Sequence, residues 1–141
     1  MYDEIYGAVG LLTLRSAAVE RSLDALCWVL RNRRRDQFET SGKPLTDILS
    51  ALGKLASNEG EPLQTELLSI RARVNELKES RNHVIHGLWT GRDKPETWTV
   101  TRAMRRNPIP QAKEFTVDSV SVLAESYAEV LDRIIELKLP L

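Results

Sequence analysis

The chain has 141 residues, a formal net charge of zero at pH 7 and 42% hydrophobic residues. These values are typical of one globular domain with its own hydrophobic core, so we expect a single domain over residues 1–141. The balanced charge provides no bulk attraction to nucleic acid or to a membrane surface. Any affinity for RNA therefore has to come from local clusters of basic side chains.

The chain contains a single cysteine, Cys27, which has no partner for an internal disulfide. This fits a reducing compartment, and we interpret Cys27 as a small buried hydrophobic residue. No apolar run is long enough to cross a membrane, and the N-terminus is acidic, unlike a secretion signal. We therefore expect a cytoplasmic protein without membrane contact.

Apolar residues recur every three or four positions from the N-terminus into the low thirties, which predicts one long helix that starts near Asp3. The stripe consists of Ile5, Val9, Leu12, Ser16, Val19, Leu23, Leu26 and Leu30. Cations at a helix C-terminus are favourable in themselves, and they can also bind RNA phosphates, so two interpretations of the basic run at this end stay open. The run contains Arg31, Arg33, Arg34 and Arg35.

A short second helix is predicted after Pro44, a residue that suits a helix start. Its apolar face consists of Leu45, Ile48, Leu49, Leu52 and Leu55. A third helix opens at Glu61 and Pro62 and carries an apolar stripe of Leu63, Leu67, Ile70, Val74 and Leu77. The same stepping next reaches Arg81, then Val84 and Leu88. A charge on a core-facing stripe is costly unless it is paired or opens onto a cleft or a partner.

Gly87 is expected to end the third helix, and beyond it the pattern changes to a period of two, which predicts a β-hairpin. Trp98 and Val100 fall on one face of this hairpin. We expect Trp89 and Trp98 to anchor it on the helices, with stacking on unpaired bases as the alternative. Residues 107–110 are expected to be an extended connection. A second basic cluster lies between the hairpin and this connection, and it consists of Arg102, Arg105 and Arg106.

The last helix is predicted to begin at Thr116 as its N-cap and to end before Pro140. Its apolar stripe is Val120, Leu123, Tyr127, Val130, Ile134 and Leu137. The predicted fold is therefore all-α: an up-and-down four-helix bundle with a small β-hairpin inserted between the third and fourth helices.

Both histidines of the chain lie near the end of the third helix. Asn82 and His86 are four residues apart, so their side chains can meet on one helix face, and we expect Asn82 to hold the His86 ring in one orientation. The long side chain of Arg81 can reach the same pocket. His83 and His86 are three apart and could share a metal with Glu79. No further ligand set is evident, so we expect no metal and no other cofactor.

The segment Arg81-Asn82-x-x-x-His86 resembles the R-x-x-x-x-H signature of the HEPN superfamily, both in the polar residue after the arginine and in its position at the end of the third helix. The superfamily includes metal-independent ribonucleases of toxin–antitoxin, abortive-infection and CRISPR systems. The resemblance implies a HEPN-like ribonuclease, acting as a toxin or phage-defence effector, with Arg81, Asn82 and His86 as its catalytic residues.

The resemblance also implies a homodimer in which two copies of the motif form one composite site. An antitoxin or a regulatory protein is a further candidate partner. One subfamily carries a tyrosine two residues after the histidine, where this chain has Leu88, so the resemblance does not specify the type of that partner. We expect His83 and the two arginine clusters to contact the RNA.

Arginine and histidine together suit RNA cleavage by attack of the ribose 2′-hydroxyl on the adjacent phosphorus, because arginine binds the phosphate and histidine carries protons. The products would be a 2′,3′-cyclic phosphate and a 5′-hydroxyl. Two alternatives stay open. The first is a non-catalytic module that binds RNA, a nucleotide or another protein. In the second, Arg81 and His86 are structural and pair with an acidic residue.

Overall fold

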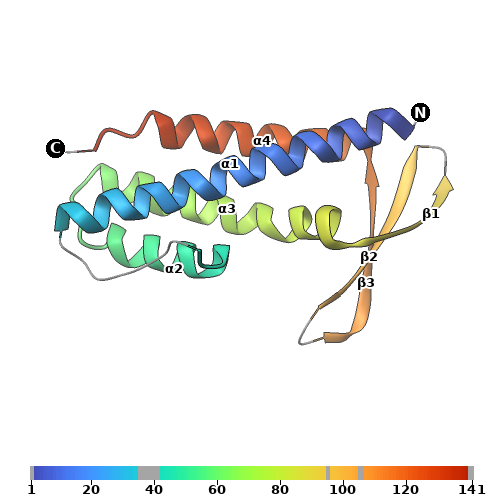
Figure 1. Cartoon of the computed structure of the whole chain (residues 1–141), viewed down its shortest axis with the longest axis horizontal. Helices are drawn as coiled ribbons and strands as arrows, with labels where there is room; N and C mark the ends of the chain where they lie inside the picture. Colours follow the sequence, from blue (N-terminus) through green and yellow to red (C-terminus); the bar gives the residue numbers. More distant parts are fainter. Residues whose placement is uncertain (1, 35–41, 95, 105–106, 140–141) are drawn as a thin grey trace. The chain divides into compact units, whose positions relative to one another are not determined.

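The structure is a computed structural model that describes residues 2–34, 42–94, 96–104 and 107–139. Over these ranges it is mainly α-helical with one three-stranded antiparallel sheet, which confirms the predicted helical class (Figure 1). No helix within these ranges has the length and apolar character needed to cross a membrane. The elements in chain order are α1 (Tyr2–Arg34), α2 (Leu45–Ala56), α3 (Leu63–His86), β1 (Leu88–Lys94), β2 (Thr97–Met104), β3 (Asn107–Thr116) and α4 (Val117–Ile135).

The chain forms two compact units, and three of its helices continue from one unit to the other. Unit 1 comprises Met1–Ser16 and Leu77–Tyr127, and unit 2 comprises Ala17–Glu76 and Ala128–Leu141. Each unit buries its own set of apolar side chains. In unit 1 these include Ile5, Leu12, Val84, Trp98, Val100, Phe115, Val120 and Tyr127, and in unit 2 Leu23, Leu26, Leu30, Leu52, Leu55, Leu67, Ile70 and Val74.

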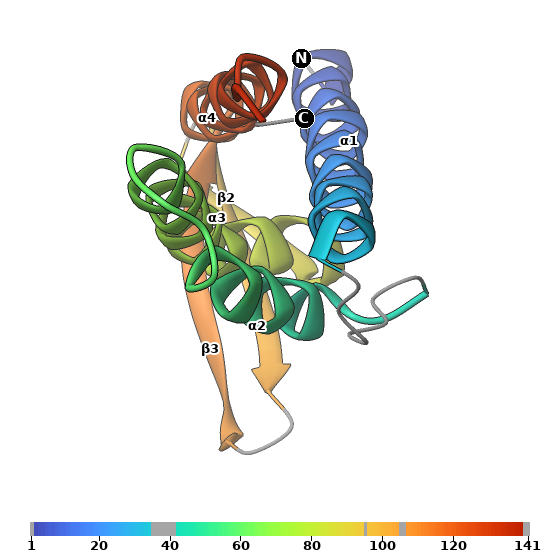
Figure 2. The same cartoon turned by 90° about the vertical axis from the view of Figure 1, so that its left-hand side faces the viewer.

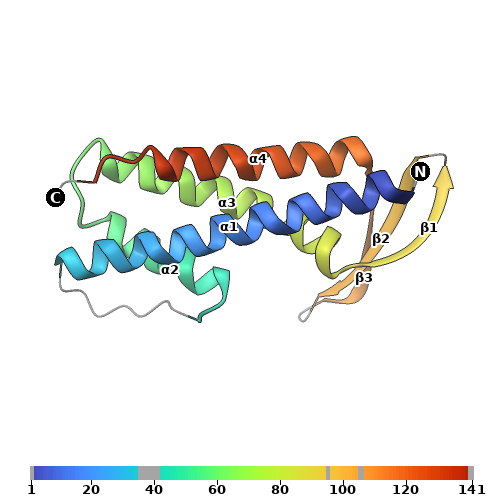
Figure 3. The same ribbon diagram turned by 45° about the horizontal axis from the view of Figure 1, so that its top comes forward.

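In unit 2, α2 lies beside the N-terminal part of α3 (Figure 2). The predicted apolar face of α2 is buried at Ile48, Leu49, Leu52 and Leu55. The Arg71 side chain of α3 donates from Nε to the Leu49 carbonyl over 2.7 Å. The C-terminal part of α4 also runs beside α3 (Figure 3), and there Arg133 Nη2 donates to Ser69 Oγ over 2.7 Å. Polar side chains therefore connect α3 to both neighbouring helices.

In unit 1, the sheet has the order β1-β2-β3, with β2 in the centre (Figure 1). The sequence predicts a two-stranded hairpin here and an extended connection over residues 107–110, at the start of β3. In the structure β3 pairs with β2 along its length, and Phe115 lies opposite Trp98. Prolines at Pro108 and Pro110 obscure this strand in the sequence. They are tolerated because β3 is an edge strand.

One face of the sheet is buried as predicted, because Trp98 and Val100 are both enclosed. The Trp89 ring packs edge-on against the Trp98 ring, with 6.4 Å between the ring centroids and 63° between the planes. The Trp89 Nε1 group donates to the Val84 carbonyl of α3 over 3.1 Å. These contacts support packing, rather than base stacking, as the role of the two tryptophans.

The start of α4 follows directly from β3 and has the cap that the sequence predicts. Thr116 Oγ1 accepts from the Ser119 backbone N–H over 3.0 Å, and Ser119 Oγ accepts from the Thr116 N–H over 2.8 Å. This reciprocal pair satisfies two backbone donors that a helix start leaves open. The helix direction of α4 is therefore set at the edge of the sheet.

Candidate functional site

The candidate site lies at the C-terminal end of α3, within unit 1. The stripe of α3 is buried through Leu77, and Val84 is buried one turn beyond Arg81. Arg81 itself is partly buried, between these apolar positions. A cation therefore does interrupt the apolar stripe of α3, as the sequence predicts. The contacts of the Arg81 side chain determine what this cation can bind.

The Arg81 guanidinium is held by two neutral acceptors. Its Nε donates to Ser16 Oγ of α1 over 3.3 Å, and its Nη1 donates to Asn82 Oδ1 over 3.0 Å. Ser16 is buried, and its hydroxyl in turn donates to the Thr13 carbonyl over 3.3 Å. No carboxylate in the part of the chain that the structure describes pairs with Arg81. Its positive charge is therefore oriented but not neutralised by these residues.

The Asn82 side chain bonds to Arg81 and not to His86, whose ring it is predicted to orient. Its side-chain oxygen accepts the Arg81 bond, and no hydrogen bond joins Asn82 to His86 among the described residues. Asn82 therefore supports the arginine, whereas the expected orientation of the His86 ring by this amide is not seen here.

His86 is the last residue of α3, and its side chain is exposed. Among residues 2–34, 42–94, 96–104 and 107–139, it forms no hydrogen bond. Because residues five apart on a helix differ by about 140° in direction, Arg81 and His86 project from different sides of α3. The imidazole is thus accessible to solvent and free to meet a ligand.

His83 is fully buried, and it packs within unit 1 instead of facing solvent. Its Nε2 lies 3.1 Å from the Gln111 carbonyl of β3, so this nitrogen carries the proton and donates it. The ring centroid lies 6.4 Å from that of Phe115. Nδ1 is buried without a hydrogen-bond partner among the described residues. The contacts of His83 dock β3 onto the end of α3, and they leave it no surface toward RNA.

The two basic clusters are only partly described. Arg102 of β2 lies 3.6 Å from Glu79 of α3 in an ion pair within unit 1. Arg31 belongs to unit 2 and is buried. Arg33 and Arg34 continue the backbone of α1, but their side chains are outside the described part, as are residues Arg35, Arg105 and Arg106. The Arg102 side chain is therefore neutralised in part, and Arg31 does not present a surface cation.

Ser16 and Gln111 are the two site residues that sequence reasoning missed. Ser16 did carry a signal, because a hydroxyl stands in the otherwise apolar stripe of α1, as Arg81 stands in the stripe of α3. Gln111 contributes a backbone carbonyl, which any residue could supply, so its identity carried no signal.

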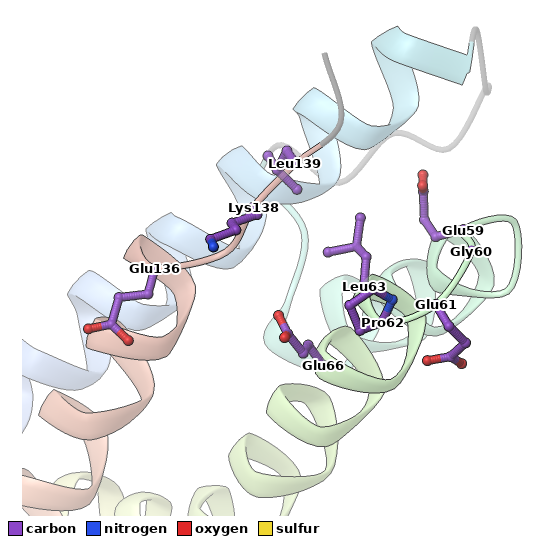
Figure 4. Close-up of a pocket in the computed structure, with 9 residues that line it drawn as sticks. All are labelled: Glu59, Gly60, Glu61, Pro62, Leu63, Glu66, Glu136, Lys138 and Leu139. Atoms are coloured by element: carbon purple, nitrogen blue, oxygen red, sulfur yellow. The ribbon is translucent and has the colours of Figure 1, made fainter.

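A cavity of about 540 Å³ lies in unit 2, and it contains none of the candidate residues (Figure 4). Four carboxylates line it, together with a single ammonium group from Lys138. They belong to Glu59 and Glu61 before α3, Glu66 in α3 and Glu136 after α4. This excess of negative charge is unfavourable for a phosphate ligand. No group of three or more histidine, cysteine or acidic side chains in the described ranges is arranged to hold a metal ion.

Comparisons with known proteins return no match: no family model, no curated protein and no solved structure is similar to this chain.

Proposed function

We propose that the protein is a HEPN-like, metal-independent endoribonuclease in which Arg81 binds the scissile phosphate and His86 transfers protons. The observation that carries the proposal is the state of Arg81, whose guanidinium is oriented by Ser16 and Asn82 without a described carboxylate partner. These two bonds use two of its five N–H groups. The remaining three N–H groups lie in the same guanidinium plane, and they suit hydrogen bonds to two oxygens of one phosphate.

In the proposed reaction, the ribose 2′-oxygen forms a bond to phosphorus while the bond from phosphorus to the 5′-oxygen breaks. A base removes the 2′-hydroxyl proton, and an acid protonates the departing 5′-oxygen. Arg81 stabilises the negative charge that gathers on the two non-bridging oxygens. The products are a 2′,3′-cyclic phosphate and a 5′-hydroxyl.

Two proton transfers in one step call for two groups, and each chain offers one exposed histidine, His86. A second copy of the chain would supply the second imidazole, and the active species we propose is therefore a homodimer with a composite site. The proposed fold of each subunit is a four-helix bundle of the HEPN type, and the proposed location is the cytoplasm. The proposed role is that of a toxin or phage-defence effector controlled by an antitoxin or a regulatory protein.

One observation favours a second candidate function, a non-catalytic module that binds RNA or a nucleotide. Arg81 is held in place, whereas the described residues do not orient the His86 ring. Anion binding requires only the former, and general acid–base catalysis requires an oriented imidazole. The two candidates differ in whether bound RNA is cut.

The test is cleavage of a mixed set of end-labelled RNAs by the full-length protein in the presence of EDTA. We expect cyclic phosphate ends from the wild type, a loss of at least about 100-fold in rate for His86→Ala, and a comparable loss for Arg81→Ala. Arg73→Ala is the matched control, because Arg73 is an arginine of the same helix and has a partly exposed side chain. It belongs to unit 2, whereas the candidate site belongs to unit 1. Arg73→Ala should leave the rate unchanged.

Cleavage that persists in His86→Ala would refute the assignment of the proton-transfer role. Salt-sensitive RNA binding without cleavage, lost in Arg81→Ala but not in His86→Ala, would establish the binding module instead.

A further inference from the structure

The N-terminal part of α1 is apolar on both its inner and its outer side. No charged residue occurs from Ile5 through Leu14. The inner side of this segment is buried in unit 1 at Ile5, Ala8 and Leu12. The outer side exposes 69% of Tyr6, 42% of Leu11 and 71% of Leu14. A helix that is apolar all round is normally covered on all sides, so this outer face is suited to a partner.

Two glycines lie on the same outer face. Gly7 and Gly10 are both exposed within α1, and a Cβ atom added at either would meet no described atom within 4 Å. Glycine is less favourable than alanine inside a helix, and packing against the described residues does not require it here. A glycine on an apolar outer face allows the backbone of another helix to approach closely.

We propose that this face, formed by Tyr6, Gly7, Gly10, Leu11 and Leu14, pairs with the same face of a second copy in antiparallel orientation. The positions are self-complementary about a twofold axis midway between Gly10 and Leu11. In this register Leu14 of one copy packs into the space over Gly7 of the other, and the two segments cross at Gly10 and Leu11. Leu14 is thus matched with Gly7, and Leu11 with Gly10, in both directions, while Tyr6 lies opposite Arg15 of the other copy.

The charges that flank the face are complementary in the same register. Glu4 and Arg15 are eleven residues apart, so they lie within about 20° of each other around the helix, on one flank of the face. Antiparallel pairing brings the same flanks of two helices together. In this register Glu4 of each copy lies opposite Ala17 of the other, about 3 Å along the helix axis from Arg15, a distance that the long arginine side chain spans. A parallel pair would instead bring the flank of Glu4 and Arg15 against the opposite flank, where Thr13 lies, and would leave the two charges unpaired. This argues for a second copy as the occupant.

The area of the face indicates a weak dimer. Taking about 200 Å² for a tyrosine and about 170 Å² for a leucine side chain, the exposures of Tyr6, Leu11 and Leu14 give roughly 330 Å² per copy. Two copies bury roughly 660 Å² through these side chains, before the glycines and the flanking residues are added. This is below the roughly 1,200 Å² at which standard specific interfaces begin, so we expect only a weak, reversible dimer. We therefore expect a dissociation constant in the micromolar range.

Sedimentation equilibrium of the full-length protein tests the pairing, in the absence of RNA. Wild-type protein should be substantially dimeric at about 100 µM. Leu14→Glu should weaken the dimer by at least about 10-fold because it places a carboxylate against the backbone of the second copy. Val122→Glu is the matched control, since Val122 is an apolar residue of α4, also in unit 1, with 61% exposure. A monomeric wild type, or equal effects of the two variants, would overturn the proposal.

Cysteine cross-linking tests the orientation, and the native thiol does not interfere because Cys27 is buried. Gly10→Cys should form a disulfide between two copies. Gly7→Cys alone should not, because the two sites would be about 10 Å apart along the helix axis, but it should cross-link when mixed with Leu14→Cys. Equal cross-linking of Gly7→Cys and Gly10→Cys would indicate a parallel pair and refute the register. The proposed ribonuclease also calls for a homodimer but specifies no interface. A dimer that Leu14→Glu does not weaken would therefore refute only this face, and a dimer weakened as expected that cuts no RNA would refute only the ribonuclease.

Discussion

Replacement of Gly87 by alanine is the sharpest structural perturbation of the candidate site. Gly87 follows α3, and its N–H donates to the His83 carbonyl over 2.9 Å. A Cβ atom at this position would overlap both that carbonyl oxygen and Val100 Cγ1, and it would lie 3.3 Å from the Thr101 carbonyl oxygen. The glycine is therefore required by the close approach of β2 to the end of α3.

The cost of this overlap follows from the atoms involved. Val100 is fully buried, and the His83 carbonyl belongs to the helix backbone, so neither can move aside without separating β2 from α3. Overpacking of a well-packed core costs about 1–3 kcal/mol, and the rigid backbone partner favours the upper half of this range. The lower chain entropy of unfolded alanine offsets about 0.4–1 kcal/mol. We expect a net loss of about 2 kcal/mol.

Urea unfolding followed by tryptophan fluorescence measures this loss, since Trp89 and Trp98 both lie in unit 1. The corresponding decrease in Tm is roughly 6–8 °C for a chain of this size. Gly60→Ala is the matched control, because a Cβ atom at Gly60 would meet nothing within 4 Å, and its effect should stay below about 1 kcal/mol. If Gly87→Ala changed stability by less than about 0.5 kcal/mol, the proposed packing of β2 on α3 would be wrong.

Two further predictions concern buried groups in each unit. In unit 1, the bond from Arg81 Nε to Ser16 Oγ can be measured by a double-mutant cycle of Ser16→Ala and Arg81→Met in urea unfolding. We expect a coupling energy of about 0.5–1.5 kcal/mol. A coupling near zero would show that the two groups do not bond. In unit 2, burial raises the pKa of the Cys27 thiol from 9.0 to about 12. The Asp24 charge adds to this increase, and the Arg31 charge opposes it. As the pH rises, the thiol of the unfolded chain loses its proton at a lower pH than the thiol of the folded protein. The stabilisation that the protonated Cys27 thiol gives the folded state is therefore complete below pH 9, and it falls by up to about 1.4 kcal/mol per pH unit between pH 9 and 12. Thermal unfolding should show this additional slope in wild-type protein relative to Cys27→Ala, and parallel pH profiles for the two would contradict it.

Local patterns in the sequence predict the helices well. The stripe of α1 predicts a single helix despite Gly7 and Gly10, and the structure confirms it over Tyr2–Arg34. Period-two alternation correctly buries Trp98 and Val100 on one face. Both signals are local, because side-chain direction along a helix or a strand repeats within a few residues.

The candidate site was predictable only in part. The sequence identifies Arg81 as a cation in an apolar stripe and His86 as an imidazole at a helix end, and both placements hold in α3. It also suggests that Asn82 orients His86, whereas the amide oxygen accepts from Arg81. Spacing alone shows that two side chains can meet, and competition among neighbours decides which of them do.

What the sequence determined by itself was the set of helices, the buried face of the sheet and the position of one cation among leucines. Only the tertiary structure decided that a serine 65 residues away accepts from this cation, that His83 is enclosed and His86 exposed, and that β3 extends the sheet. The physical reason is that each of these outcomes depends on a contact between segments far apart in the chain. Such contacts follow from packing and hydrogen bonding in three dimensions, and no short-range period records them.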